Sequence, residues 1–214
     1  VPFALHLDHG KSIEECAAAI QAGFTSVMFD GSLLPLAENI NQTRQIVEFA
    51  HRFNVSVEAE IGTIGSMSNS DEGGVENITY TKAEEVVDFV EATGCDALAI
   101  AIGTAHGIYP KGFRPKLQLE LLTEINKVAT VPLVLHGGSN NPDDEIAKAC
   151  QIGIQKVNIS SDIKQVFFKK VNEIYTETGN FMPPQVFNPS ILEVRKTVQE
   201  KMELFGSSDK ATYY

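Results

Sequence analysis

Six short apolar segments, each followed by an amphipathic stretch, recur along the chain and limit its fold more than any other feature. They are FALHLD, TSVMFDG, VSVEAEIG, DALAIAIG, VPLVLHGG and IQKVNISS. Nearly continuous apolar runs are typical of strands buried on both faces of a parallel sheet, because crossover helices cover those faces. Helical periodicity predicts helices over residues 12–22, 36–53, 83–93, 116–128, from about 142, from 162 onward, and 190–205. The pattern therefore predicts an α/β fold with a parallel sheet.

Chemically capable residues stand at the ends of the expected strands. They are Asp8 and His9, Asp30, Glu58 and Glu60, His106 just past its strand, His136, and Asn158. In a (β/α)8 TIM barrel the carboxyl ends of the strands carry the active site, whereas an open doubly wound sheet places its site at one switch point. We expect a single barrel domain over residues 1–214. The chain has six strands and opens on one, so we expect strands three to eight, without the first two βα units. The helix over 190–205 is expected to pack over the barrel or to serve a subunit contact.

Charge and cysteine usage narrow the class of protein. The net charge of −11 disfavours broad binding to nucleic acid or an anionic membrane, since both need a basic surface. No apolar run is long enough to span a bilayer, and no signal peptide is apparent. Cys16, Cys95 and Cys150 are scattered, which predicts reduced, buried thiols in a cytoplasmic protein rather than a thiolate metal site.

Three histidines follow the ends of different strands, and each is followed by glycine: His9, His106 and His136. A single histidine near a strand end is more often a hydrogen-bonded structural residue. Three at equivalent positions fit a catalytic zinc site, which takes three protein ligands and leaves a fourth position open. Of the other histidines, His6 is expected in the barrel interior or beside a carboxylate, and His51 on the surface.

Carboxylates accompany these histidines. Asp30 is placed to orient a ligand imidazole. Asp8 is a candidate proton donor and acceptor, with a helix N-cap as the alternative, although Ser12 is the better cap. Glu58 and Glu60 share one face of a strand, and two buried carboxylates are costly without a cation. We therefore expect a metal or a lysine near them.

Two glycine- and serine-rich turns resemble phosphate sites. HGGSNNPDDEI contains consecutive glycines, then Ser139 and a helix start, and NISSD places Ser160 and Ser161 before another helix. Backbone N–H groups at helix starts bind phosphate, and the loops after the last two strands of such barrels frequently do so. The alternative is that the glycines make tight turns and the serines cap helices.

Taken together, LHLDHG, SVEAEIG, AIGTAHG, LVLHGGS and KVNISSD, in this order, resemble the class II (metal-dependent) ketose-bisphosphate aldolases. The segments GFTSVMFDGS, PLAEN and KMELFGSSDKA match as well. The resemblance implies a TIM barrel with two strands upstream of LHLDHG, a zinc ion, and a homodimer or homotetramer. It also implies reversible cleavage of a small phosphorylated sugar. Fructose 1,6-bisphosphate, or its tagatose epimer, would give dihydroxyacetone phosphate and glyceraldehyde 3-phosphate.

The resemblance also implies residue roles. His9, His106 and His136 would hold zinc, with Glu60 helping to hold or relocate it. Asp8 would exchange a proton with the C4 hydroxyl, and Asn158 would meet the enediolate. The residues expected around the C1 phosphate are Gly107, Gly137, Ser139, Ser160 and Ser161. A monovalent cation, Na⁺ or K⁺, would lie against the carbonyls of Gly107 and Gly137.

The chain departs from the family at two places. The acidic residue expected eight positions after Glu60 is replaced by Ser68, and Asp71 or Glu72 would take its catalytic role if the loop shifts register; otherwise the loop carries no chemistry. The arginine expected to grip the distal phosphate is absent before Arg195. Two alternatives therefore stay open: an aldolase for another ketose phosphate, and a non-catalytic phosphosugar-binding homologue. Schiff-base chemistry is disfavoured because no lysine is expected at a strand end.

Overall fold

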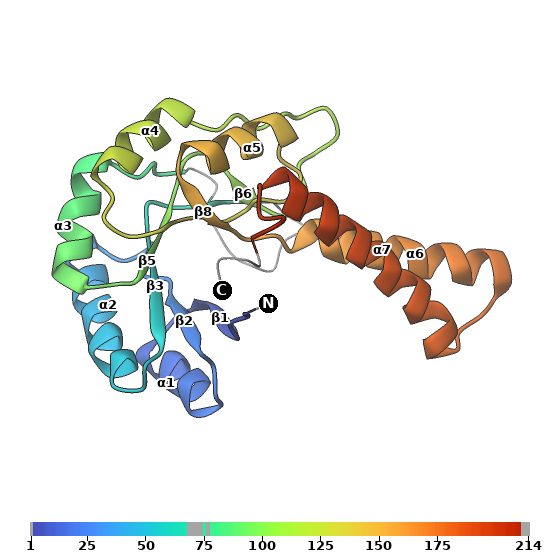
Figure 1. Ribbon diagram of the computed structural model, residues 1–214, viewed down its shortest axis with the longest axis horizontal. Helices are drawn as coiled ribbons and strands as arrows, with labels where there is room; N and C mark the ends of the chain where they lie inside the picture. Colours follow the sequence, from blue (N-terminus) through green and yellow to red (C-terminus); the bar gives the residue numbers. More distant parts are fainter. Residues whose placement is uncertain (1, 68–74, 76–77, 211–214) are drawn as a thin grey trace.

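The computed structural model describes residues 2–67, 75 and 78–210, and its centre is a curled six-stranded sheet (Figure 1). All neighbouring strands are parallel, and their order along the sheet is β1 (His6–Gly10), β2 (Ser26–Phe29), β3 (Ser56–Ile61), β5 (Ala97–Ile100), β7 (Leu133–Leu135) and β8 (Ile154–Val157). The predicted α/β class and the six strands are confirmed. Over the described residues the sheet forms a half-barrel, not a closed barrel.

Five helices cover the outer side of the sheet (Figure 1). They are α1 (Ile13–Gln21), α2 (Leu36–His51), α3 (Ala83–Thr93), α4 (Leu119–Val128) and α5 (Asp143–Ile152). Their ends lie within a few residues of the predicted ones because the local signals are strong. Ser12 caps α1 by accepting a hydrogen bond from the N–H of Glu15, and Gly94 ends α3 in the left-handed conformation.

Strand alternation separates the apolar core from the polar interior. Val27 and Phe29 point outward into the main core between sheet and helices, where both are fully buried. Met28, between them, points inward and joins Ala99 and Val134 in a small second cluster. The inner face thus carries little apolar packing, and the carboxyl ends of the strands are left for polar side chains.

A short second sheet was not predicted. β4 (Gly65–Ser66) and β6 (Ala105–His106) pair in parallel beyond the ends of β3 and β5. Two-residue strands carry no readable periodicity, so the sequence pattern could not reveal them. The pairing fixes the backbone of His106, which was expected just past the end of its strand.

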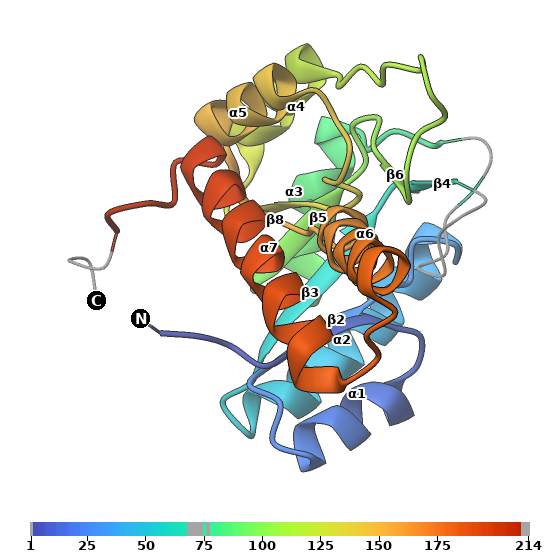
Figure 2. The same ribbon diagram turned by 90° about the vertical axis from the view of Figure 1, so that its right-hand side faces the viewer.

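The last two helices form a hairpin that projects from the half-barrel (Figures 1 and 2). α6 spans Ser161–Thr178 and α7 spans Pro183–Leu204, and the two pack along each other. α7 starts earlier than predicted because Pro183 and Pro184 occupy its first turn, where no N–H donor is needed. The structure places α7 beside α6 and α5 rather than across the barrel, so the first of the two expected roles is wrong, and the second, a subunit contact, stays a prediction. Of the helices in the described ranges, none has the length and apolar character needed to cross a membrane.

Candidate active site

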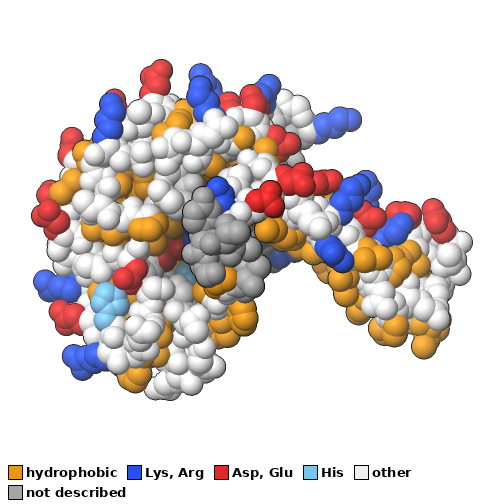
Figure 3. Space-filling model, in the orientation of Figure 1, with side chains coloured by type: hydrophobic (Ala, Val, Ile, Leu, Met, Phe, Trp, Pro, Cys, Tyr) orange, Lys and Arg blue, Asp and Glu red, His pale blue; other side chains and the backbone are white. Residues whose placement is uncertain are grey.

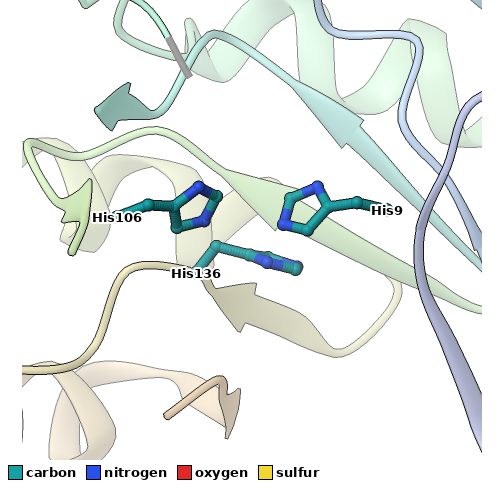
Figure 4. Close-up of side chains that lie close together, drawn as sticks. All are labelled: His9, His106 and His136. Atoms are coloured by element: carbon teal, nitrogen blue, oxygen red, sulfur yellow. The ribbon is translucent and has the colours of Figure 1, made fainter. Parts of the chain in front are cut away.

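Three histidine side chains from separate strand ends meet inside the half-barrel (Figure 4). The ring of His9 lies 4.9 Å from that of His106 and 4.5 Å from that of His136, measured between centroids. One nitrogen from each ring lies within 4.8 Å of one from each of the others. The spacing allows the three nitrogens to share one metal ion, so the cluster predicted from sequence is present as a geometric unit.

Asp8 and His9 reach the same site although they are neighbours on a strand. Simple alternation would send them to opposite faces. His9 has a left-handed φ of 50°, and the pairing of β1 with β2 shifts register between Leu7 and Gly10. Asp8 Oδ1 consequently lies 3.9 Å from Nδ1 of His136, whose ring is also in contact with that of His9. The irregular strand end brings a carboxylate and an imidazole to one side.

A buried carboxylate orients the ring of His9. Nδ1 of His9 lies 3.0 Å from Oδ2 of Asp30, as predicted. Burial opposes ionisation of Asp30, but hydrogen bonds from His9, Lys11 and Ser32 outweigh it and hold its pKa well below the usual range. Asp30 is therefore an acceptor, and Nδ1 of His9 donates to it. Nε2 of His9 is buried and has no hydrogen-bond partner among the described residues, so its lone pair is available to a metal.

A second carboxylate orients His136. Nε2 of His136 lies 2.8 Å from Oε1 of Glu58, and Nζ of Lys156 lies 2.9 Å from Oε2. Burial raises the pKa of Glu58, but His136 and Lys156 together lower it to about 2. Nε2 of His136 therefore donates to a carboxylate, which leaves the lone pair of Nδ1 facing Asp8 and Asn158. The expected cation beside the paired glutamates is Lys156.

Lys156 also corrects the expectation that no lysine lies at a strand end. It belongs to β8, and its side chain shares a face with Asn158, two residues later. Nζ donates to Oδ1 of Asn158 at 2.8 Å. The signal was the two-residue spacing of Lys156 and Asn158. The ammonium group is paired with a carboxylate, unlike the desolvated neutral amine that Schiff-base chemistry needs.

Glu60 lies in a second metal-compatible group with His9 and Asp30. The residue is 1% exposed, and its Oε2 has no hydrogen-bond partner in the described part of the chain. Burial and the neighbouring charge of Asp30 raise its pKa well above the usual value. A carboxylate in this environment is strongly stabilised by a cation, so both orphaned atoms, Oε2 of Glu60 and Nε2 of His9, fit a metal ion.

A cavity of about 270 Å³ adjoins the histidines. Its wall contains every residue predicted around the phosphate: Gly107, Gly137, Ser139, Ser160 and Ser161. Asp8, Asn158 and Lys156 line the same space, together with His106 and His136. The backbone start of α6 forms one side, so its N–H groups and dipole favour an anion there.

The remaining predicted residues are Glu72, Ser68, Asp71, His51, His6 and Arg195. Glu72, with Ser68 and Asp71, falls outside the described residues. His51 is on the surface, as expected, and bonds Asp96 at 2.9 Å. His6 lines the cavity, with its Nδ1 2.8 Å from Oγ of Ser26. The exposed Arg195 lies on α7 and does not line the cavity.

Comparison with known proteins gives consistent matches. The family model described as "Fructose-bisphosphate aldolase class-II" matches residues 1–210. A 6-phospho-5-dehydro-2-deoxy-D-gluconate aldolase of Bacillus licheniformis is 44% identical over 212 residues, covering 99% of this chain and 71% of the relative. A fructose-bisphosphate aldolase of Geobacillus stearothermophilus is 43% identical, covering 99% and 72%.

Solved structures are similar as well. A putative fructose-1,6-biphosphate aldolase from Coccidioides immitis superposes with a TM-score of 0.86 at 31% identity, covering 100% of this chain and 75% of that one. The YdjI aldolase from Escherichia coli K12 gives a TM-score of 0.82 at 35% identity, covering 96% and 70%.

Proposed function

The chain belongs to the class II fructose-bisphosphate aldolase family, and on that premise we propose that it is a zinc-dependent lyase that reversibly cleaves fructose 1,6-bisphosphate to dihydroxyacetone phosphate and glyceraldehyde 3-phosphate. The observation that carries the proposal is the group of three histidines beside a cavity with a helix start in its wall.

His9, His106 and His136 would hold the zinc ion, with Glu60 as an additional ligand. Imidazole nitrogens suit zinc, and ligating histidines commonly donate their other N–H to a carboxylate, as His9 and His136 do here. When bound, zinc supplies a Lewis acid that polarises the carbonyl of the ketose.

Asp8 is the proposed acid and base at the C4 hydroxyl. It is half exposed at the cavity, and its Oδ1 accepts a hydrogen bond of 3.0 Å from Nδ2 of Asn158. Lysine can only donate, so the contact of Lys156 with Oδ1 of Asn158 fixes that amide with its NH₂ group toward Asp8. The same NH₂ group is placed to donate to a substrate oxygen that gains negative charge during cleavage.

The phosphate at C1 is proposed to bind between the two serine-containing turns. Ser139, Ser160 and Ser161 offer hydroxyl groups, and the start of α6 offers backbone N–H groups. This arrangement needs no arginine. It therefore accounts for one phosphate, whereas the group that would hold the distal phosphate is not among the lining residues.

A second substrate class is favoured by that observation. Among the described residues, no arginine lines the cavity, and the basic side chains in its wall are those of Lys156 and the histidines. A relative at 44% identity carries the name of a 6-phospho-5-dehydro-2-deoxy-D-gluconate aldolase. The alternative proposal is an aldolase for that type of single-phosphate sugar acid, and tagatose 1,6-bisphosphate is the epimeric alternative.

The test is release of dihydroxyacetone phosphate by the full-length protein, followed through NADH oxidation by glycerol-3-phosphate dehydrogenase. Fructose 1,6-bisphosphate, tagatose 1,6-bisphosphate and 6-phospho-5-dehydro-2-deoxy-D-gluconate are compared. For the sugar acid, the assay also follows the aldehyde product. Each substrate is run with and without EDTA, and bound zinc is measured by plasma emission. His9→Asn is expected to lose both zinc and activity, while the matched surface variant His51→Asn keeps both. Zinc bound by the native protein without cleavage of any substrate would favour the non-catalytic binding homologue.

We also propose a homodimer or homotetramer in a cytoplasmic setting. Exposed apolar side chains gather on the projecting hairpin, including Phe168, Phe181, Ile191 and Leu192, and Figure 3 shows an apolar band on that arm. The three cysteines are unpaired, which suits a reducing compartment. Light scattering behind size-exclusion chromatography gives the oligomer mass, and a monomer at micromolar concentration would contradict the proposal.

A further inference from the structure

We propose that the side-chain amide of Asn141 takes the place of the monovalent cation, so that this protein needs neither Na⁺ nor K⁺ at the turn that follows β7. The family resemblance places such a cation against the carbonyls of Gly107 and Gly137, and the second of these belongs to this turn. The residues of this chain do not fit it there. The activity arm of the test rests on the proposed function; the stability arm does not.

Asn141 holds two carbonyl groups of the turn at once. Its Nδ2 donates to the carbonyl of Gly137 at 2.7 Å and to that of Ser139 at 3.0 Å. The residue is 7% exposed. The amide orientation follows from the partners, because the reverse orientation would set Oδ1 against two carbonyl oxygens. Both NH₂ protons are therefore committed to the turn.

The oxygen atom of the same side-chain amide is not stabilised at this position. Oδ1 of Asn141 is buried and has no hydrogen-bond partner among the residues that the structure describes. An unpaired buried oxygen is destabilising, and an apolar side chain of equal size would avoid that cost. The amide therefore stabilises the turn only through the two hydrogen bonds that its Nδ2 donates.

Those two bonds compete directly with a cation. Carbonyl oxygens are the groups with which proteins replace the hydration shell of an alkali ion. Here the NH₂ group already presents partial positive charge to the oxygens of Gly137 and Ser139. A cation on these oxygens would be repelled by the NH₂ group or would displace it. Displacement would leave a second buried polar group of Asn141 without a partner.

The conformation of this turn matters because the turn contacts three parts of the site. Gly137 has a φ of 63° and packs so tightly that a Cβ would lie 2.7 Å from the carbonyl oxygen of Ala105, in the strand that carries His106. Oγ of Ser139 accepts hydrogen bonds from the N–H groups of Ser160 and Asp162, each at 3.3 Å. Asn141 is thus a positioning residue: it fixes the turn that joins β6, β7 and the start of α6 around the cavity.

The test compares K⁺ with the tetramethylammonium ion, which is too large for such a site, at equal ionic strength. The native full-length protein, loaded with zinc, is expected to show the same Tm and the same kcat/KM in both salts. Asn141→Asp keeps the shape but replaces the donor by a carboxylate beside two carbonyls, which recruits a cation. We expect K⁺ to raise the Tm of this variant by about 2–4 °C and its kcat/KM by about tenfold.

Asn126→Asp is the matched control. Nδ2 of Asn126 donates to the carbonyl of Ile152 at 2.9 Å on the exposed side of the molecule, so the same change is made to the same kind of bond away from the cavity. Its Tm is expected to be equal in the two salts. Asn141→Leu replaces Asn141→Asp if the latter does not fold, and it too should gain a response to K⁺.

Two outcomes would overturn the inference. One is a native protein whose Tm rises specifically with K⁺ or Na⁺. The other is a folded Asn141 variant that responds to K⁺ no more than Asn126→Asp does. Absence of turnover in every salt would count against the proposed function instead, and the Tm comparison would still decide the role of Asn141.

Discussion

Replacing Lys156 by methionine tests the charge network behind the histidines. Lys156 lies 2.9 Å from Glu58, which is 3% exposed and also bonds His136. Lys156→Met keeps the length of the side chain and removes its charge. Glu58 would then be a buried carboxylate supported by an imidazole alone, and breaking one side of a buried ion pair is destabilising.

The magnitude follows from the pKa of Glu58, which is about 2 in the fold against 4.5 for an ordinary glutamate. The difference corresponds to about 3 kcal/mol for the whole network. Lys156 supplies part of this and its side chain is 38% exposed, so solvent screens its share. We expect Lys156→Met to lower the free energy of unfolding by about 1–2 kcal/mol at pH 7.

The pH dependence has a definite sign. A carboxylate whose pKa is lowered by folding contributes its full stability above the unfolded pKa, 4.5, and loses it as the pH falls toward about 2. Removing Lys156 raises the folded pKa of Glu58. The acid-induced loss of stability should still begin near the unfolded pKa of 4.5, but it should end at a higher pH than in the native protein and be smaller in total.

The assay is urea unfolding of the chelator-treated protein, so that bound metal does not mask the network. Lys156→Met, Glu58→Gln and the double variant form a cycle, with an expected coupling of about 1–2 kcal/mol. Lys82→Met removes the lysine of an exposed pair with Glu85, 2.8 Å apart, and is expected to cost clearly less than Lys156→Met because solvent screens an exposed pair. Equal costs for Lys156→Met and Lys82→Met, or an additive cycle, would refute the reasoning.

Three further outcomes are expected. Burial raises the pKa of Cys16 and Cys95 to about 11, so a thiol reagent at pH 8 should modify them only at the rate of global unfolding; fast labelling of the native protein would contradict their burial. Phe89→Ala empties a fully buried core position and should cost about 3–5 kcal/mol in urea unfolding; a cost below about 1 kcal/mol would mean that the core collapses around the gap. Gly137→Ala sets a Cβ 2.7 Å from the Ala105 carbonyl at a φ of 63°, and should lower stability by at least about 1–2 kcal/mol; an unchanged midpoint would show that the turn can move.

Most of the fold could be predicted because each strand and helix carries a strong local pattern. All six strands of the main sheet were expected, Ser12 acts as the expected helix cap, and Gly94 ends the helix that was expected over 83–93. The start of α7 was missed because Pro183 and Pro189 read as helix breakers, although both lie within the observed helix. Register and closure depend on contacts between distant strands, which periodicity does not encode.

The sequence predicted which residues form the site better than it predicted the contacts between them. Because the three histidines follow strand ends, they were predicted to meet. The free-energy cost of burying two carboxylates predicted a cation near Glu58. Lys156 was missed as a cavity residue, because its two-residue spacing from Asn158, which places both side chains on one face, was not used. Asn141 was missed entirely, because an asparagine in a turn normally signals only the turn itself.

The left-handed backbone of His9 has an evolutionary consequence. A φ of 50° is less stable by about 1–2 kcal/mol for a residue with a Cβ, whereas glycine adopts it without this strain. Selection for stability alone would therefore favour glycine at this position, and the change would delete an imidazole from the histidine cluster. Histidine at this strand end stands against the preference of its own backbone, so a population selected for stability alone should acquire glycine here before its apolar core begins to change.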